Sequence, residues 1–174
     1  RELLKEVPHY RFLDLSIVFN CLVESSPSGS ATILIHNQHL NYWGITKDDL
    51  YALAQQNTPR LLSYDLRNMT DILKELLSDE DIPADAPDAT TSYPMYVLTN
   101  RYKLNGSGCI LYQNLLRDFA NRLESDLFIL PSSVHEVLII PVKNKTSPQE
   151  LSDMVKDVNS SQLSREEVLS DHVY

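Results

Sequence analysis

Apolar and polar side chains alternate early in the chain in a pattern that predicts paired β-strands. From Leu13 to Val23 every odd position is apolar, whereas the even positions include Asp14 and Ser16. Because successive side chains of a strand point to opposite faces, this alternation predicts a half-buried strand. Turn-forming residues at 25–29 separate it from a second apolar run at 31–36. The two runs therefore predict a first β-hairpin.

A second pair of apolar runs, 95–102 and 109–112, flanks the sequence Asn105-Gly106-Ser107-Gly108. Asn-Gly between apolar runs indicates a tight hairpin turn, because both residues tolerate positive φ. The same glycines are a candidate phosphate-binding loop, but their spacing fits neither a P-loop nor a dinucleotide-binding fingerprint. We therefore expect a hairpin here, and we expect no cofactor.

The third pair of runs lies in Leu127–Val142, which reads LFILPSSVHEVLIIPV. Apolar runs of four to eight residues between turn formers are typical of buried strands. Within the second run, Val137–Val142, the apolar side chains occupy both odd and even positions. Both faces of that strand should then be covered, which predicts that this hairpin lies at the centre of the sheet.

Apolar side chains at helical spacing follow each predicted hairpin. Thr46 is a typical N-cap for a first helix that Pro59 should end, and a short helix is expected from Thr70. A further helix carries one apolar stripe within residues 115–123. The start Ser147-Pro148-Gln149-Glu150 combines a serine cap, a first-turn proline and a capping-box glutamate.

The order of these elements predicts an α+β fold. Its sheet should be largely antiparallel and built from three β-hairpins, each followed by an amphipathic helix, with Val168–Tyr174 as a C-terminal strand. A length of 174 residues suits a single domain over residues 1–174. Residues 79–94 should form a mobile loop, since residues 79–88 hold two prolines and five acidic side chains but no basic one.

Composition narrows the classes of partner. The formal net charge is −9, and the 15 basic residues are scattered, so we expect binding neither to nucleic acid nor to an anionic membrane surface. No apolar run approaches the ~18 residues of a membrane-spanning helix. Cys21 and Cys109 both fall in apolar runs, which predicts two buried free thiols in a reducing cytoplasm. Because the chain opens with Arg1, we expect it to be part of a longer protein.

The polar turn within Leu127–Val142 is a candidate catalytic site. It offers the hydroxyls of Ser132 and Ser133, the imidazole of His135 and the carboxylate of Glu136. Serine hydrolysis needs a hydroxyl near an imidazole that a carboxylate orients. In an extended strand Ser133 and His135 share a face while Glu136 points to the other, so the alternative is a hairpin turn in which serines satisfy backbone groups.

Two further groups of polar residues are candidate ligands or catalytic groups. His36 and His39 are three residues apart, a ligand-like spacing on a helix or tight turn, but metal binding needs further ligands. Asp171 and His172 lie close to the last residue of the sequence, and they could join His135 only if folding brings them together. The alternative interpretation of His36 and His39 is a polar strand exit before Trp43.

Seven segments of the chain resemble, in the same order, an uncharacterised family of anaerobic Gram-positive bacteria, domain-of-unknown-function family 5688. They are FLDLSIVF, TILIHNQHLNYWGIT, NTPRLL, YVLTN, GCILY, LPSSVHEVLIIP and LSDHVY. The resemblance covers nearly the whole chain. It implies an intracellular protein of which this segment is the C-terminal part. No catalytic residues can be carried over from the family, because none are assigned in it.

Two functions follow as hypotheses. The first is a cytoplasmic binding or regulatory module without catalysis, whose partner is a protein: the rest of its own chain, a second copy or another protein. Aromatic side chains suit such a role, since they bury much area at low entropy cost; the candidates are Tyr42, Trp43, Tyr51, Tyr64, Tyr93 and Tyr96. The second hypothesis is a hydrolase or metal-dependent enzyme that uses the turn at Ser132, Ser133, His135 and Glu136.

Overall fold

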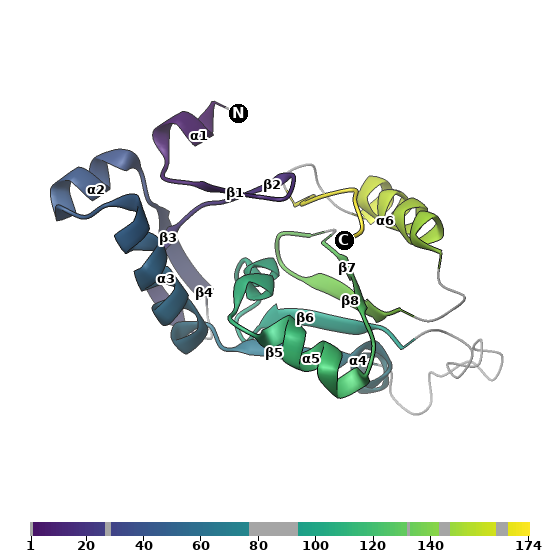
Figure 1. Cartoon of the computed structure of the whole chain (residues 1–174). Coiled ribbons are helices and arrows are strands. Elements are labelled where there is room, and N and C mark those ends of the chain that lie inside the picture. The colour runs from purple at the N-terminus through teal and green to yellow at the C-terminus, as the bar shows by residue number, and fades with distance from the viewer. Residues whose placement is uncertain (1, 27–28, 77–93, 132, 143–146, 163–166) are drawn as a thin grey trace. The chain divides into compact units, whose positions relative to one another are not determined.

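The computed structural model in Figure 1 shows helices together with antiparallel strands, which confirms the α+β class. The chain divides into two compact units, a first unit of Arg1–Ser63 and a second unit of Tyr64–Tyr174. The single domain over residues 1–174 stays a prediction. The residues described are 2–26, 29–76, 94–131, 133–142, 147–162 and 167–174. Apart from Pro94, the predicted acidic loop at 79–94 lies outside them.

The first unit holds two antiparallel hairpins and three helices. Its elements are α1 (Leu3–Glu6), β1 (Tyr10–Phe12), β2 (Leu15–Ile17), β3 (Asn20–Ser26), β4 (Gly29–Leu34), α2 (Asn37–Trp43) and α3 (Lys47–Leu61). The predicted hairpin is present as β3 and β4. The continuous strand expected from Leu13 is wrong, because the chain reverses there: Phe12 pairs with Leu15 across a two-residue turn, and Leu13 has φ +56°.

A small apolar core holds the first unit together. Phe19 and Ile35, which flank the β3–β4 pairing, pack with Leu40 of α2 and Leu50 of α3. The edge of this core is polar: the Tyr10 hydroxyl donates a hydrogen bond to Asp48, and that bond raises the Tyr10 pKa to about 12. Strand β1 and helix α3 are thus joined both by apolar contact and by a hydrogen bond.

Helix α3 begins as predicted, at a capping box. Thr46 Oγ1 accepts a hydrogen bond from the Asp49 backbone N–H at 3.1 Å, and an Asp49 carboxylate oxygen accepts the Thr46 backbone N–H at 2.9 Å. Pro59 does not end the helix, which continues to Leu61. Helix α2 was not predicted, since it lacks a Ser, Thr, Asp or Asn cap; its N-cap residue is His36.

This capping box should make the stability of the first unit depend on pH in a way that can be measured. We expect Thr46→Ala to lower the free energy of unfolding by about 1 kcal/mol, because it leaves a helix N–H without its acceptor. Hydrogen bonds from Thr46 lower the Asp49 pKa, so the stabilisation is present above the ordinary aspartate value of 3.8 and is lost as the pH falls through the lowered folded value. The variant should therefore lose less stability than the wild type on acidification to about pH 3.

Trp43, the sole tryptophan, reports on the unfolding of the first unit by fluorescence. The control is Gln55→Ala, a change at an exposed residue in the middle of α3, which should leave the dependence of the unfolding free energy on pH unchanged. A Thr46→Ala profile parallel to that of the wild type would contradict the role of the box.

The second unit is built on a four-stranded antiparallel sheet with the order β5-β6-β8-β7. Its strands are β5 (Tyr64–Asn68), β6 (Tyr96–Asn100), β7 (Leu127–Leu130) and β8 (Val137–Pro141). Its helices are α4 (Met69–Leu76), the 3₁₀ helix η1 (Gly106–Leu111), α5 (Leu115–Leu123) and α6 (Pro148–Gln162). The helices expected near Thr70, at 115–123 and after Ser147 are confirmed, whereas β5 was not predicted.

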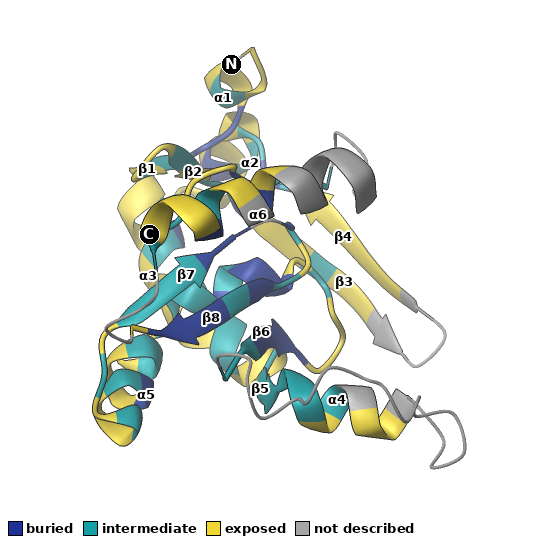
Figure 2. Cartoon of the chain, turned by 90° about the vertical axis from the view of Figure 1, so that its right-hand side faces the viewer, coloured by how far each residue is buried: buried dark blue, intermediate teal, exposed yellow. Residues whose placement is uncertain are grey.

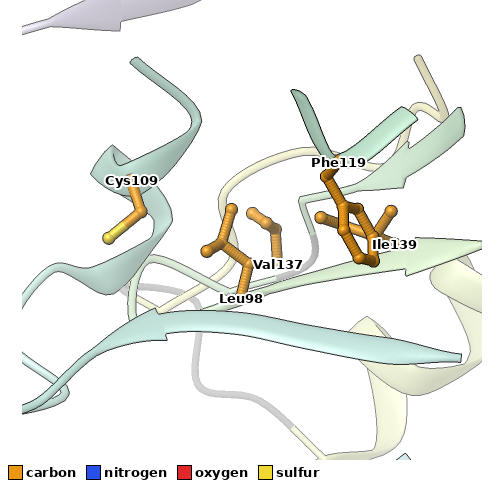
Figure 3. Close-up of a cluster of buried hydrophobic side chains, with 5 residues drawn as sticks. All are labelled: Leu98, Cys109, Phe119, Val137 and Ile139. Carbon is orange, nitrogen blue, oxygen red and sulfur yellow. The ribbon is translucent and has the colours of Figure 1, made fainter. Parts of the chain in front are cut away.

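Strand β8 is buried on both faces, as the sequence predicts, and it lies inside the sheet (Figure 2). The other strand of the hairpin, β7, was expected at the centre as well, but it is the last strand of the sheet. On one face, Val137 and Ile139 join Leu98, Cys109 and Phe119 in a cluster below α5 and η1 (Figure 3). On the other face, Ile140 packs with Leu130 of β7 and with Leu151 and Val155 of α6. Helix α6 therefore covers the second face of β8.

The prediction of a second hairpin from the runs 95–102 and 109–112 is wrong, because the second run does not form a strand. Residues 109–112 do not pair with β6; most of them belong to η1, which puts Cys109 into the core. Asn105 does take a positive φ of +46°, but Gly106 does not. Gly106 serves a different need: a Cβ atom there would lie within 3.0 Å of Thr99 and of the His135 carbonyl oxygen. The glycine permits close packing instead of a turn.

The C-terminal residues lie along the outer edge of β7. Ile129 and Tyr174 exchange both backbone hydrogen bonds, at 2.7 and 3.0 Å, and Ser133 forms a bridge with Val168. The Ser170 N–H donates to the Pro131 carbonyl at 3.1 Å. The predicted last strand is thus present as an irregular pairing rather than a regular strand.

Both cysteines are free thiols, but only one is buried. Cys109 has 1% of its surface exposed, and burial raises the pKa of its thiol to about 11. Cys21 is exposed on β3, so the prediction of burial is wrong for it: the hairpin continues beyond the core that covers Phe19. In the described part of the chain, no helix has the length and apolar character needed to cross a bilayer.

Candidate functional site

The turn between β7 and β8 holds the serines that the sequence singles out. Ser133 is buried, and its Oγ accepts a hydrogen bond from the His135 backbone N–H at 3.0 Å. Such a serine stabilises its own turn. Between the described side chains, no hydrogen bond joins the Ser133 hydroxyl to the His135 ring. Ser132 lies outside the described residues.

The His135 side chain lies beside the C-terminal segment, residues 167–174. Its Nε2 lies 3.8 Å from Glu167 Oε1, and both side chains are about half exposed. Its own carbonyl oxygen accepts a hydrogen bond from Thr99 Oγ1 at 2.8 Å. Glu136 was the carboxylate that the turn itself offered, although the alternation of faces argued against it, whereas the structure brings Glu167 to His135, a residue with no local signal for this role. An exposed ion pair of this kind contributes little to stability and joins the turn to the C-terminal segment.

A second Ser-x-His turn, at Ser170 and His172, lies in the C-terminal segment that pairs with residues 129–134. Ser170 Oγ accepts the His172 backbone N–H at 3.1 Å, as Ser133 does for His135. Because Ser170 pairs with Pro131 while the Val134 N–H donates to Glu167, the two histidines lie toward opposite ends of an antiparallel pairing. The structure therefore does not bring Asp171 and His172 together with His135.

Two polar side chains, those of Ser107 and Thr99, hold the His135 turn against η1 and β6. The Ser107 hydroxyl and backbone N–H both donate to the Val134 carbonyl, at 2.8 and 3.2 Å. Thr99 Oγ1 donates to His135, and Gly106 lets η1 approach both groups. Sequence reasoning missed Thr99 and Ser107, because their partners are far away in the chain. Because these hydrogen bonds join it to η1 and β6, the turn is well suited to fixing the fold.

His36 and His39 lie at the start of α2. His39 Nδ1 accepts the His36 backbone N–H at 2.9 Å, so this ring nitrogen is used to cap the helix. The His39 ring stacks on Trp43, with centroids 5.6 Å apart and planes inclined by 26°. Among the described residues, no group of three or more His, Cys, Asp and Glu side chains has the arrangement of a metal site.

The aromatic candidates divide into partly buried and exposed residues. Tyr51 packs on the core of the first unit and Tyr96 on the core of the second. Tyr42 and Trp43 at the end of α2 are 84% and 51% exposed, and Tyr64 is exposed as well. Tyr93 lies outside the described residues.

Exposed apolar side chains are concentrated in the first unit. Of eleven large hydrophobic residues that are exposed in the described parts of the chain, eight belong to it: Leu3, Leu13, Val23, Ile33, Tyr42, Trp43, Leu53 and Leu61. The first unit is also nearly neutral, with five basic and six acidic residues, whereas the second has ten basic and eighteen acidic ones. The apolar surface and the negative charge of the chain thus lie in different units.

Comparison with known proteins gives a family and nothing further. A family model matches residues 1–174, and the family it describes is of unknown function. Neither a search of curated proteins nor a search of solved structures finds a match.

Proposed function

The chain belongs to this family of unknown function, DUF5688, and we propose that it is a binding module whose first unit binds a protein partner. The observation that carries the proposal is the concentration of exposed apolar side chains in a nearly neutral unit. The centres of protein interfaces are depleted of charge and enriched in aromatic residues. The free thiols support a reducing compartment, the bacterial cytoplasm that the family resemblance implies.

The strongest candidate anchor is the pair Tyr42 and Trp43. Tyrosine and tryptophan dominate the residues whose truncation costs most at interfaces. Trp43 is held before binding, because its ring stacks on His39 and α2 ends directly behind it at Gly44, which has φ +65°. An aromatic ring that is already fixed loses little entropy when a partner covers it.

The test uses the tryptophan itself as the probe. The full chain would be cross-linked to its partner in the cells that encode it, and the purified partner would then be titrated against the chain. We expect the Trp43 emission to shift to the blue and its quenching by acrylamide to fall as the partner covers the ring. Trp43→Ala should weaken the affinity, measured by calorimetry, by about thirtyfold, which corresponds to about 2 kcal/mol.

Gln38→Ala is the matched control, since Gln38 is an exposed polar residue on the same helix. It should leave the affinity within about twofold of the wild type, as surface changes away from an interface core do. The proposal fails if a partner binds equally well to the wild type, to Tyr42→Ala and to Trp43→Ala.

The enzymatic alternative has one observation in its favour, the approach of His135 to a carboxylate at 3.8 Å. The neighbouring hydroxyl of Ser133 is already an acceptor for the backbone, and Cys109 is a buried thiol that stays protonated near neutral pH. Turnover of a model ester that His135→Ala abolishes would establish this alternative in place of the binding module.

A further inference from the structure

The two edges of the sheet in the second unit differ in whether another segment of the chain covers them. The outer edge of β7 is covered by the chain itself, through the Ile129–Tyr174 and Pro131–Ser170 hydrogen bonds. At the other edge β5 pairs with β6 only, and the described residues supply no strand on its outer side. An uncovered edge presents a row of backbone donors and acceptors that can pair with another chain.

The sequence of β5, Tyr64-Asp65-Leu66-Arg67-Asn68, is complementary to itself when it is read in the opposite direction. In an antiparallel pair centred on Leu66, Leu66 faces Leu66 of a second copy and Asp65 faces Arg67 on both sides of the centre. From the open edge and this charge complementarity, we propose that two copies of the chain associate by pairing β5 with β5 around a two-fold axis. This dimer surface belongs to the second unit, whereas the proposed binding surface belongs to the first.

The two faces of β5 suit this arrangement. Leu66 is directly opposite Leu98 and packs on the same cluster, so pairing at Leu66 would continue that apolar layer from one copy to the next. Asp65 and Arg67 lie opposite Thr99 and Val97 and so project from the other face. Oppositely charged side chains that face each other across antiparallel strands stabilise the pairing.

The surroundings of Arg67 favour a second copy over a chain of unrelated sequence. Arg67 forms an ion pair with Glu75 of α4, and the carboxylates of Asp65 and Asp71 also act on it. In the proposed pairing Arg67 of each copy also lies opposite Asp65 of the other copy, and the two-fold axis makes this contact twice.

Cross-linking at the axis tests the register. In a Cys21→Ser background, which removes the exposed thiol, Leu66→Cys should form a disulfide-linked dimer when an oxidant is added. Facing Cα atoms of antiparallel strands are about 4.5–5.5 Å apart, within the range of a disulfide. The matched variant Asp65→Cys should stay monomeric on a non-reducing gel, because its two copies would be about 8 Å apart. Equal cross-linking of both variants would overturn the register.

Charge exchange tests the interaction without a cross-link. By analytical ultracentrifugation of the full chain, we expect a dimer whose dissociation constant rises about tenfold in Asp65→Arg and in Arg67→Asp, because like charges then face each other. The double variant Asp65→Arg/Arg67→Asp should recover most of the affinity. Asp118→Arg, the same charge change on exposed α5, should have no effect. A wild type that stays monomeric up to about 100 µM, well above a typical micromolar dissociation constant, or a double variant as weak as the singles, would overturn the proposal.

Discussion

Gly106→Ala should lower the free energy of unfolding of the second unit by about 3 kcal/mol, which is a large share of the stability of a domain of this size. An added Cβ atom would lie within 3.0 Å of Thr99 and of the His135 carbonyl oxygen, closer than Cβ atoms approach their neighbours in proteins. Two of these neighbours, the Thr99 Cα and the His135 carbonyl oxygen, belong to the backbone. The clash therefore cannot be relieved by rotating a side chain, and η1 must move away from β6.

That movement should also break contacts made by the neighbours of Gly106. Thr99 Oγ1 would lose its bond to the His135 carbonyl, and Ser107 would lose its two bonds to Val134. Each of these groups is partly buried, and a buried acceptor without its donor adds a desolvation cost. The expected loss is therefore at the upper end of the range for overpacking.

Gly108→Ala is a control two residues further along the same 3₁₀ helix. A Cβ atom at Gly108 has no neighbour within 4 Å, and the residue does not have a positive φ. We expect this variant to be as stable as the wild type or more stable by about 0.5 kcal/mol, since alanine restricts the unfolded chain. Urea denaturation followed by circular dichroism measures both variants. Equal stability of Gly106→Ala and Gly108→Ala would contradict the close approach of η1.

The error at Gly106 shows which part of the fold the sequence could not predict. Asn-Gly between apolar runs is the ordinary signal of a hairpin turn, and Asn105 does adopt the left-handed conformation. The glycine, however, is needed for a contact with residues 99 and 135, and contacts between distant residues leave no local pattern. The error at Leu13 has the opposite cause: a tight turn forms there without the glycine or asparagine that predicts one.

Elements governed by local chemistry were predictable. Helix α3 follows a capping box, and α5 carries a stripe whose Phe119 reaches the core. The candidate site shows the limit of the same reasoning. Ser133 and His135 were correctly placed in one turn, but the residues that contact His135 come from elsewhere in the sequence: Thr99 bonds to its carbonyl oxygen and Glu167 lies beside its ring. Alternation of faces correctly indicated that Glu136 is a poor partner for His135, and it could not indicate which residue is the better one.

Ile139→Ala and Ile140→Ala should each lower the free energy of unfolding of the second unit by about 2–5 kcal/mol. Adjacent residues of a strand point to opposite faces, and in a sheet with one solvated face only one of them would have a large effect. Here the two side chains are 0% and 1% exposed, one in the cluster with Phe119 and the other against Leu151 and Val155. Each truncation leaves a cavity whose lining atoms lose contact.

Val142→Ala is the matched control at the end of the same apolar run. Val142 follows β8 and is 37% exposed, so its truncation should cost less than about 1 kcal/mol. Urea denaturation of the three variants compares the two faces directly. A large effect at Ile139 with a small one at Ile140 would mean that α6 does not cover its face of the sheet in solution. Equal large effects would show that residues 148–162 belong to the same cooperative structure as the strands, because Leu151 and Val155 of α6 complete the buried cluster around Ile140.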